Sequence, residues 1–487
     1  MKNKEMPAGA PAVPGDSELA ELGVAAAAAA IRNGDITAES YSAALLRRAR
    51  DYSDLNSFIT IDESAVLAAA RDADKARAAG SSAPLLGVPI GVKDSYATRG
   101  VRTTLGVETL DSFVPAEDAD VVGAIKDAGG HVFGKINLVE MSFGLTGDNS
   151  RYGQVKNPYG PEHVPGGSSS GSGASVAARI VPAALGGDTV GSIRVPASLC
   201  GVVGFKPTTG RWPRGGVAPV SHTLDTTGIL ARSVEDAALI DQIVTKDVAV
   251  PLSDHPGLQE AKFAYAPRQY MELIDPETEA HFKDALLRLQ DAGAEVVEID
   301  LGEDFSQLAD RLTWNLFFRE AMESVTDFLR RNNFPVSFNE IYGGLKPELK
   351  EIWGHLVLPS GQGYISQEAY ETTLSVDRPE LQRRLGKVFT HSGFDALLFP
   401  TTPCPAPTIE HRSRFTVAGE EVDDRFLAKN TVPTSGAGLP GISIPIGLTG
   451  HGLPIGLEID AAHGHDRALL DLARRVESVF DTLPAPA

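Results

Sequence analysis

A run of serines and glycines stands in the middle of this chain, in PGGSSSGSGASV at residues 165–176. Flexible linkers have this composition, but AARIVPAALGGDTVGSIRVPASLCGVVGF follows directly and alternates helix-like and strand-like apolar stretches. The run therefore lies inside a core, where the buried backbone must satisfy its polar groups. Gly-rich loops do this where the backbone packs closely or surrounds an anion. A phosphate loop is not supported, because neither GKS/GKT nor GxGxxG accompanies the run.

Strand-like apolar runs occur in both halves of the chain. LLGVPIGVKD at 85–94 leads into Lys93 and Asp94, and DALLFPTTP, GISIPIGL and LPIGLEID follow one another near the C-terminus. Between them, ADVVGAIKDAGGHVFGKIN reads as a helix, a glycine turn and a strand. Because strands come from both ends of the chain with helices between them, we expect one mixed α/β core rather than a string of domains.

Helices are predicted before and between these strands. From 17 to 80 the apolar residues recur at spacings of three and four, and the last of these helices stops at Gly80. SVEDAALIDQIV opens with Ser233 and Asp236 at the spacing of a capping box, which predicts a further helix.

The chain divides into a tail and one domain in this interpretation. The first 16 residues are rich in proline and alanine and predict a flexible N-terminal tail (1–16), followed by a single domain (17–487). Within that domain, 260–390 is helical and charged. Its aromatic side chains include Trp314, Phe317, Phe318, Tyr342 and Trp353.

Composition and charge narrow the class of partner. The 487 residues are 42% hydrophobic and carry a net charge of −20, which argues against duplex nucleic acid or an anionic membrane as the main partner. No stretch of about 18 strongly apolar residues occurs, and the alanine-rich GVAAAAAAI lacks a convincing secretory cleavage pattern. We expect a cytoplasmic enzyme that acts on a small molecule, with no nucleic acid and no membrane partner.

The cysteines and histidines predict no metal site. Cys200 and Cys404 are far apart in unrelated contexts, so neither a disulfide framework nor a cysteine metal site is expected. The eleven histidines show no HExxH spacing, and the nearest pattern, HGH at His463 and His465, is typical of a solvated turn.

A second Gly-Ser pair, Gly191–Ser192, follows the first run in GGDTVGSIRVP. The long segment GGSSSGSGASVAARIVPAALGGDTVGSIRVPAS, with GVPIGVKD before it and GLPGISIPIGL and GLPIGLEID after it, resembles the amidase signature family over roughly residues 20–475. The resemblance implies that family's fold, a central mixed, twisted β-sheet flanked by helices on both faces. It also implies hydrolysis of a carbon–nitrogen bond through an acyl-enzyme, without a cofactor or metal.

The resemblance implies a catalytic triad of Lys93 as base, Ser168 as bridging serine and Ser192 as nucleophile, with a cis Gly167–Ser168 peptide bond. A serine hydroxyl attacks only when a base takes its proton. A free lysine has a pKa of about 10.4 and must lose about 3 units to act near pH 7. Burial can shift a lysine by 3–5 units, and the apolar GVPIGV before Lys93 suits this requirement.

The family's oxyanion hole falls on the backbone N–H groups of Thr189, Val190, Gly191 and Ser192. The commonest family pattern has two glycines before the nucleophile, whereas here Val190 fills the first place. The N–H group remains, but a branched side chain stands near the acyl site. The other implied site residues are Ser142 as a substrate contact and Asp188, Arg194 and Ser169 as supporting side chains.

Each of these residues alone has a purely structural explanation. Lys93 would be a surface lysine at a strand end, Ser192 a helix N-cap, Arg194 an ordinary ion-pair partner, and Asp94 and Asp188 turn residues. Together, with both spacings right, they favour catalysis.

Within the family, the signature segment and NTVPTSGAGLPGISIPIGL are most similar to the mandelamide and indoleacetamide hydrolases. The resemblance therefore favours a small aryl or arylalkyl amide as substrate. We expect the aromatic residues of 260–390 to line the substrate channel and the enzyme to be a monomer or homodimer. Anilides, aryl carbamates and esters remain open. Two alternatives are the amidase subunit of a tRNA-dependent amidotransferase and a catalytically silent binding protein.

Overall fold

The computed structural model describes residues 15–247, 257–390 and 392–486. In this part of the chain, eleven strands form one mixed sheet in the order β1-β3-β2-β4-β6-β5-β12-β13-β9-β7-β8, and β10 and β11 form a separate hairpin. The strands are β1 (Phe58–Thr60), β2 (Pro89–Lys93), β3 (His131–Ile136), β4 (Ala183–Asp188), β5 (Val203–Lys206), β6 (Thr226–Ala231), β7 (Lys262–Tyr265), β8 (Glu295–Glu298), β9 (Ala396–Pro400), β10 (Arg414–Val417), β11 (Glu420–Asp423), β12 (Gly441–Leu448) and β13 (Pro454–Asp460).

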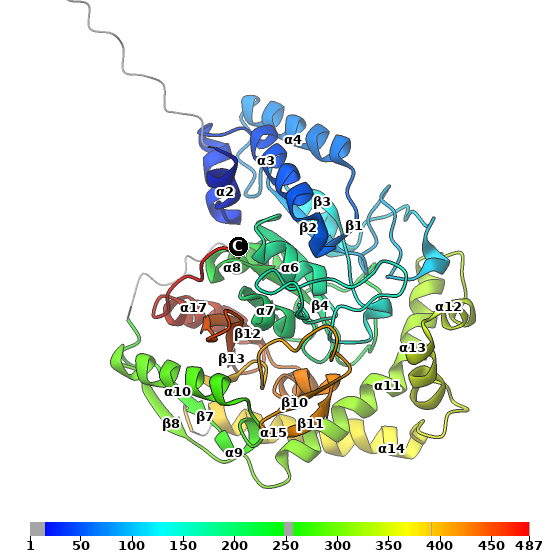
Figure 1. Cartoon of the computed structure of the whole chain (residues 1–487), viewed down its shortest axis with the longest axis vertical. Helices are drawn as coiled ribbons and strands as arrows, with labels where there is room; N and C mark the ends of the chain where they lie inside the picture. Colours follow the sequence, from blue (N-terminus) through cyan, green and yellow to red (C-terminus); the bar gives the residue numbers. More distant parts are fainter. Residues whose placement is uncertain (1–14, 248–256, 391, 487) are drawn as a thin grey trace, which may run out of the picture.

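The helices that surround the sheet come from every part of the chain (Figure 1). They are α1 (Asp16–Ala20), α2 (Val24–Asn33), α3 (Ala38–Asp51), α4 (Glu63–Ala78), α5 (Asp120–Asp127), α6 (Ser170–Ala177), α7 (Arg194–Cys200), α8 (Val234–Thr245), α9 (Pro267–Tyr270), α10 (Pro276–Asp291), α11 (Phe305–Arg331), α12 (Phe338–Gly344), α13 (Pro347–Ile352), α14 (Gln367–Thr372), α15 (Arg378–Thr390), α16 (Val432–Ala437) and α17 (Asp466–Glu477). Short 3₁₀ or π turns are η1 (Ser53–Leu55), η2 (Glu108–Leu110), η3 (Glu140–Ser142), η4 (Trp353–Val357), η5 (Thr373–Asp377) and η6 (Asp424–Ala428).

The sheet is mixed in a way that joins the two ends of the chain. At one end, β2 is parallel to both of its neighbours, β3 and β4. From β4 to β9 all neighbours are antiparallel, and β12 and β13 from the C-terminus occupy the middle of this part. The fold is therefore the mixed α/β sheet with flanking helices that the sequence analysis expects, and every run read there as strand-like forms a strand.

Two hydrophobic clusters cover the sheet at β9. Ala396 and Leu398 belong to one cluster, whereas Leu397 and Phe399 belong to the other. Successive side chains of a strand point to opposite faces, so the two clusters lie on opposite sides of this strand. The first cluster includes side chains of α8, α10 and α17, and the second includes those of α11 and α15. Both faces are therefore closed by helices.

Two short helices, α6 and α7, contact each other and pack on the strands that carry the sequence-predicted site. α6 contacts β2 and β4, and α7 contacts β5, β12 and β13. Both begin immediately after a Gly-Ser segment, so the turns that precede them lie against one another in the interior.

The structure corrects three details of the sequence interpretation. Residues 1–14 of the predicted tail lie outside the described part, but α1 already begins at Asp16, whose carboxylate accepts a hydrogen bond from Arg47. Ser233 does cap α8 through the N–H of Asp236, but the box is not reciprocal, because the Asp236 carboxylate accepts from Ala25 N at 2.8 Å instead.

The third correction concerns the region 260–390, which is not purely helical. It contributes β7 and β8, which continue the sheet beyond β9 through parallel pairing. Each of these strands has only four residues, and the pairing that stabilises them involves β9, far away in the sequence. Only the tertiary context therefore identifies them as strands.

None of the helices in the described residues has the length and apolar character needed to cross a membrane.

Candidate active site

Lys93 is the last residue of β2, and every residue of this strand is buried. Its side chain is 1% exposed, and Nζ lies 2.8 Å from Oγ of Ser168. Burial lowers the pKa of Lys93 to about 7, although the negative charges of Asp188 and Asp225 act in the opposite direction. Lys93 is therefore not a surface lysine, and near neutral pH a large fraction of it is the free amine, which is a base.

The Ser/Gly run is a buried turn that leads directly into α6. The Gly167–Ser168 peptide bond is cis, as the family resemblance implies. Backbones approach so closely here that a Cβ on Gly166, which has a φ of +82°, would lie 2.7 Å from Cα of Pro196. A Cβ on Gly171 would lie 2.3 Å from the carbonyl oxygen of Ser57. Glycine is thus required at these positions because there is no space for a side chain.

The turn between β4 and α7 carries Ser192 and is held by Asp188. The Asp188 carboxylate accepts hydrogen bonds from the backbone N–H groups of Gly191 at 2.8 Å and Ile193 at 3.2 Å. Ser169 joins this turn to the first one, because its N–H donates to the carbonyl oxygen of Ser192 at 3.2 Å. Ser169 Oγ also contacts the N–H and the carbonyl oxygen of Gly187, at 3.2 Å in each case. Ser168 and Ser192 are therefore on two neighbouring turns that are bonded to each other.

The four backbone N–H groups expected to form an oxyanion hole are not equivalent. The N–H of Gly191 is already donated to Asp188, which removes it from the expected set. The N–H groups of Thr189, Val190 and Ser192 have no hydrogen-bond partner within the described residues. A carboxylate of the same turn thus uses one of the four N–H groups, a contact that the sequence interpretation did not include.

Arg194 is completely buried and neutralises a group of buried carboxylates. Its guanidinium donates to both oxygens of Asp188 at 3.0 and 3.1 Å and to Glu458 at 3.1 Å, and it also reaches Ser435 Oγ at 2.8 Å. Burial acts to raise the pKa of Asp188, but the charge and hydrogen bonds of Arg194 outweigh it, so that this pKa lies below its usual value. Burial raises the pKa of Glu458 to about 8 despite Arg194. Arg194 and Asp188 therefore hold the turn that carries Ser192.

Asp225 is a site residue that the sequence analysis missed. One of its carboxylate oxygens accepts from Thr189 Oγ1 at 2.7 Å, and the other accepts from the N–H groups of Val220 and Ser221 at 2.8 and 3.0 Å. Burial raises the pKa of Asp225 to about 6, against the lowering effect of these hydrogen bonds. Thr189 and Asp225 come from separate segments, so no local pattern in the sequence indicates this contact.

Glu320, on α11, anchors the loop that carries Asp225. It is fully buried and accepts hydrogen bonds from Thr223 N at 3.0 Å, Thr223 Oγ1 at 2.6 Å and the hydroxyl of Tyr370 at 2.8 Å. The hydroxyl of Ser221 also donates to it. The helical region 260–390 is therefore bonded, through this loop, to the turn that carries Ser192. The sequence offered one signal for Glu320, because it is a carboxylate on the apolar face of an amphipathic helix.

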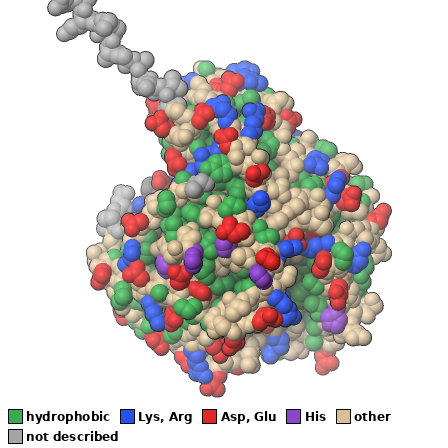
Figure 2. Space-filling model, in the orientation of Figure 1, with side chains coloured by type: hydrophobic (Ala, Val, Ile, Leu, Met, Phe, Trp, Pro, Cys, Tyr) green, Lys and Arg blue, Asp and Glu red, His purple; other side chains and the backbone are tan. Residues whose placement is uncertain are grey.

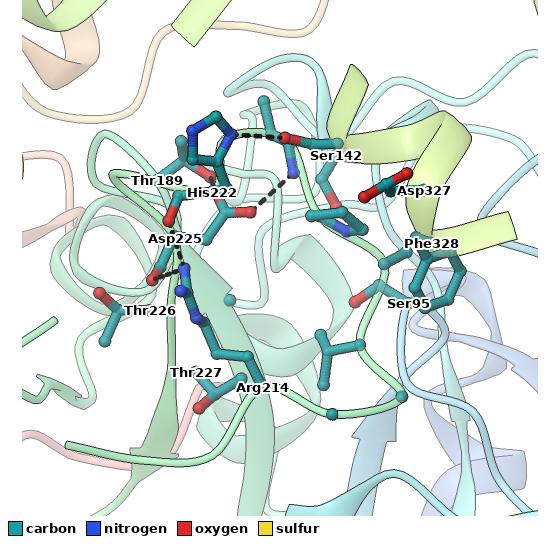
Figure 3. A pocket seen from close by; sticks show the side chains of 18 of the residues that line it. Ser95, Ser142, Thr189, Arg214, His222, Asp225, Thr226, Thr227, Asp327 and Phe328 are labelled. Carbon is teal, nitrogen blue, oxygen red and sulfur yellow. Dashed lines mark hydrogen bonds between the residues drawn. The ribbon is translucent and has the colours of Figure 1, made fainter. Parts of the chain in front are cut away.

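Two cavities meet at these turns, and we call them the polar cavity and the aromatic cavity. The polar cavity has a volume of about 570 Å³ and is lined by Lys93, Ser168 and Thr189, among others. Figure 3 shows Asp225 and Arg214 on one of its walls and Asp327 on another.

The aromatic cavity, of about 330 Å³, is lined by Ser192, Val190, Trp314, Phe317 and Phe318. Ser142 lines both cavities and has a left-handed backbone conformation, with a φ of 62°.

Of the five aromatic residues named in the sequence analysis, Trp314, Phe317 and Phe318 line the aromatic cavity. Tyr342 and Trp353 are not among the lining residues of either cavity. Trp353 is fully buried and stacks on Phe338 with ring centroids 5.3 Å apart. These two side chains belong to the hydrophobic packing around α12 and α13, and composition alone could not separate them from lining residues.

The cysteines and the HGH histidines were considered as metal ligands in the sequence analysis. Cys200 and Cys404 are free and buried, and His463 and His465 are exposed. The described residues contain no group of three or more His, Cys, Asp or Glu side chains placed to hold a metal ion. On the face shown in Figure 2, acidic and basic side chains are interspersed.

The chain is similar to known amide hydrolases along nearly its whole length. The family model Amidase matches residues 41–470. Mandelamide hydrolase of Pseudomonas putida is 36% identical over 482 residues, covering 96% of this chain and 93% of the relative. Indoleacetamide hydrolase of Pseudomonas savastanoi is 35% identical over 399 residues, covering 82% and 84%. A glutamyl-tRNA(Gln) amidotransferase subunit of Desulforapulum autotrophicum is 35% identical over 504 residues, covering 96% and 99%.

The chain is also similar to solved structures of amidases. The crystal structure of an amidase superposes with a TM-score of 0.84 at 29% identity, covering 94% of this chain and all of the other. The native peptide amidase of Stenotrophomonas maltophilia gives 0.76 at 26% identity, covering 96% and 98%. The chain therefore belongs to the amidase signature family, and it is an amidase.

Proposed function

We propose that this amidase hydrolyses small aryl or arylalkyl amides through an acyl-enzyme on Ser192, with Lys93 as the base and Ser168 as the bridging group. The observation that carries the proposal is the 2.8 Å contact between Lys93 Nζ and Ser168 Oγ in a buried site where the pKa of Lys93 is about 7. A base needs both hydrogen-bond reach and a pKa near the operating pH. Lys93 meets both requirements.

The proton path follows from the order of these groups. Ser192 Oγ attacks the carbonyl carbon, its proton passes to Ser168, and the proton of Ser168 passes to neutral Lys93. When the carbon–nitrogen bond breaks, Ser168 donates a proton to the leaving nitrogen and regains one from Lys93. Water then attacks the acyl-enzyme by the same path, which releases the acid and restores Ser192. The N–H groups of Thr189, Val190 and Ser192 are the proposed donors to the oxyanion, because no protein group uses them in the described part of the chain.

The aromatic cavity supports an aryl group on the acyl side. Ser192 lies at its wall, beside Trp314, Phe317 and Phe318. Edge-to-face and offset contacts with such rings favour aromatic ligands. Amides, anilides, carbamates and esters all present a carbonyl to the same nucleophile, so the acyl group is the part of the substrate that this cavity selects.

A role within an amidotransferase is the second candidate, because a relative with that name is also 35% identical over 96% of this chain. That role requires glutamine as amide donor, whose α-amino and α-carboxylate groups are both charged. Most side chains that line the cavity with Ser192 are instead apolar, and its charged side chains, Asp423, Asp424 and Arg425, come from one short segment of the wall. The aryl amide therefore fits this cavity better, and the enzyme is proposed to act alone on a small molecule, as a monomer or homodimer.

A substrate panel tests the proposal. Purified protein is offered phenylacetamide, mandelamide, indole-3-acetamide, glutamine, and matched anilides, carbamates and esters, with the Ser192→Ala variant as control. Turnover of the arylalkyl amides with little turnover of glutamine is expected. Glutamine as the preferred substrate would contradict the proposal and support the amidotransferase alternative.

A further inference from the structure

The polar cavity is larger than the proposed hydrolysis of a primary amide requires. Such a substrate releases ammonia, which is about the size of a water molecule, and water occupies about 30 Å³ in the liquid. The polar cavity has a volume of about 570 Å³, and sites for organic ligands typically have volumes of about 300–1,000 Å³. The cavity is therefore large enough for a second half of the substrate.

The chemistry at the junction decides which half of the substrate faces each cavity, and this step rests on the proposed function. The group that protonates the leaving nitrogen is Ser168, which lines the polar cavity together with Lys93. The group that attacks the carbonyl carbon is Ser192, which lines the aromatic cavity. A substrate with its carbon at Ser192 and its nitrogen at Ser168 thus directs its acyl group into the aromatic cavity and its nitrogen substituent into the polar cavity.

The walls of the polar cavity indicate a polar substituent. They present hydroxyl groups, a histidine and charges of both signs (Figure 3). Polar side chains of its wall are Ser95, Arg214, His222, Thr227, Ser324 and Asp327. Several of these groups already bond to the protein, which holds them in place, as Arg214 does through the carbonyl oxygens of His222 and Asp225. A small number of fixed polar groups of this kind orients a polar ligand.

We infer that the polar cavity is a binding site for the amine half of a secondary amide, whose nitrogen carries a substituent with hydrogen-bonding groups. In hydrolysis, the carbon–nitrogen bond breaks, the Ser192 ester forms, and the nitrogen leaves as the neutral amine with the proton from Ser168. In the reverse direction, a bound amine attacks the acyl-enzyme, gives one proton to Ser168 and releases Ser192 as the free hydroxyl with a new amide. The same cavity therefore also takes amines as acyl acceptors.

The test uses an acyl group that makes no demand on the aromatic cavity. The enzyme is acetylated with p-nitrophenyl acetate, and glycinamide or ammonia is added as acceptor. N-acetylglycinamide, acetamide and acetate are then measured by mass spectrometry. After correction for free-base concentration and for the uncatalysed reaction with the ester, glycinamide should be favoured over ammonia by at least about tenfold. The ratio of N-acetylglycinamide to acetate should also reach a plateau as the glycinamide concentration rises, because the acceptor then fills a binding site.

The outcomes separate this inference from the proposed function. If transfer to glycinamide shows no saturation and is no faster than transfer to ammonia, the cavity is only a water-filled entrance. This result would overturn the inference and leave arylamide hydrolysis in place. Failure to acetylate Ser192 at all would overturn both. Transfer to glycinamide by an enzyme that ignores arylalkyl amides would uphold the inference and overturn only the proposed acyl group.

A pair of variants on α11 tests whether the amine binds in the polar cavity. Ser324 lines the polar cavity and is 7% exposed, so that Ser324→Leu fills part of the space. Thr326, two residues further along the helix, is exposed and lines neither cavity, which makes Thr326→Leu the control. A misfit of one methylene is worth about 10–200-fold, and Leu exceeds Ser by more than one methylene, so Ser324→Leu should lower the ratio of N-acetylglycinamide to acetate at least about tenfold. The control should keep the wild-type ratio. An unchanged ratio in Ser324→Leu, with normal acetylation and circular dichroism, would overturn the inference.

Discussion

Nζ of Lys93 lies 2.8 Å from Oγ of Ser168, and both side chains are almost completely removed from solvent, at 1% exposure each. Lys93 comes from the end of β2, whereas Ser168 comes from a glycine-rich turn before α6. The pairing of a lysine with a neutral hydroxyl, rather than with a carboxylate, leaves burial as the main influence on its pKa.

Ser192→Ala should abolish formation of the acyl-enzyme, and Ser168→Ala and Lys93→Ala should each lower kcat by several orders of magnitude. Groups that act as a unit are not additive, so the double variant Lys93→Ala/Ser168→Ala should be little worse than either single variant. Stopped-flow kinetics and labelling with a fluorophosphonate, followed by peptide mapping, measure both effects. Labelling at a residue other than Ser192, or activity that survives Ser192→Ala, would refute the assignment.

The pH dependence of kcat/KM should follow the deprotonation of Lys93. Because burial lowers the pKa of Lys93 to about 7, kcat/KM should rise as the pH passes through about 7 and level off above it. An acidic limb near pH 4, or a rise that appears only near 10, would contradict this prediction.

Stability provides an independent measurement of the same pKa. Between pH 7 and 10.5 the unfolded chain retains a proton on Lys93 that the folded protein has lost, so this residue makes the free energy of unfolding rise with pH over that window. Lys93→Met should reduce that slope in denaturant titrations.

Val190→Gly should widen the range of acyl groups that the enzyme accepts. Val190 lines the aromatic cavity beside Ser192, and the backbone N–H remains in the variant. One methylene of misfit is worth about 1–3 kcal/mol, or 10–200-fold. The ratio of kcat/KM for α-substituted over unsubstituted arylacetamides should therefore rise, with circular dichroism as the control of folding. An unchanged ratio would place acyl selectivity in the side chains of α11 and α13 instead.

Thr189→Val should lower kcat more than it raises KM. The Thr189 hydroxyl donates to Asp225 at 2.7 Å, and its own N–H is a proposed donor to the oxyanion. A hydrogen bond to a charged group is worth about 1.5–3 kcal/mol, so a loss of about 10–100-fold is expected. Thr189→Ser retains the hydroxyl and should restore most of the rate. Equal losses in the two variants would show that the bond to Asp225 does not position this turn.

Arg194→Met should destabilise the whole protein. It leaves the ionised Asp188 buried without its cation, and breaking a buried ion pair from one side costs about 3–5 kcal/mol. Urea unfolding at neutral pH measures the loss. Arg268→Met is the matched control, because Arg268 is exposed and its partners Asp300 and Glu303 are exposed as well. A loss no larger than that of the control would contradict the proposed role of Arg194 as the charge that holds this turn.

Features that depend on local chemistry could be predicted from the amino-acid sequence. The glycines of 165–176 and the pair Gly191–Ser192 indicated tight turns because no side chain fits where backbones meet, and the apolar run before Lys93 indicated a buried strand that ends at this lysine. Strand and helix periods then sufficed for a mixed α/β sheet.

Contacts between distant segments emerge only when the chain is folded. The bond from Thr189 to Asp225 and the anchoring of the preceding loop by Glu320 join residues whose local patterns are unrelated. The strands β7 and β8 are too short to be recognised without their partner β9. The two cavities meet at Ser142 because loops and α11 converge there. A sequence pattern reports which face of an element is apolar, but it does not report which distant element covers that face, and the shape of this site depends on the covering elements.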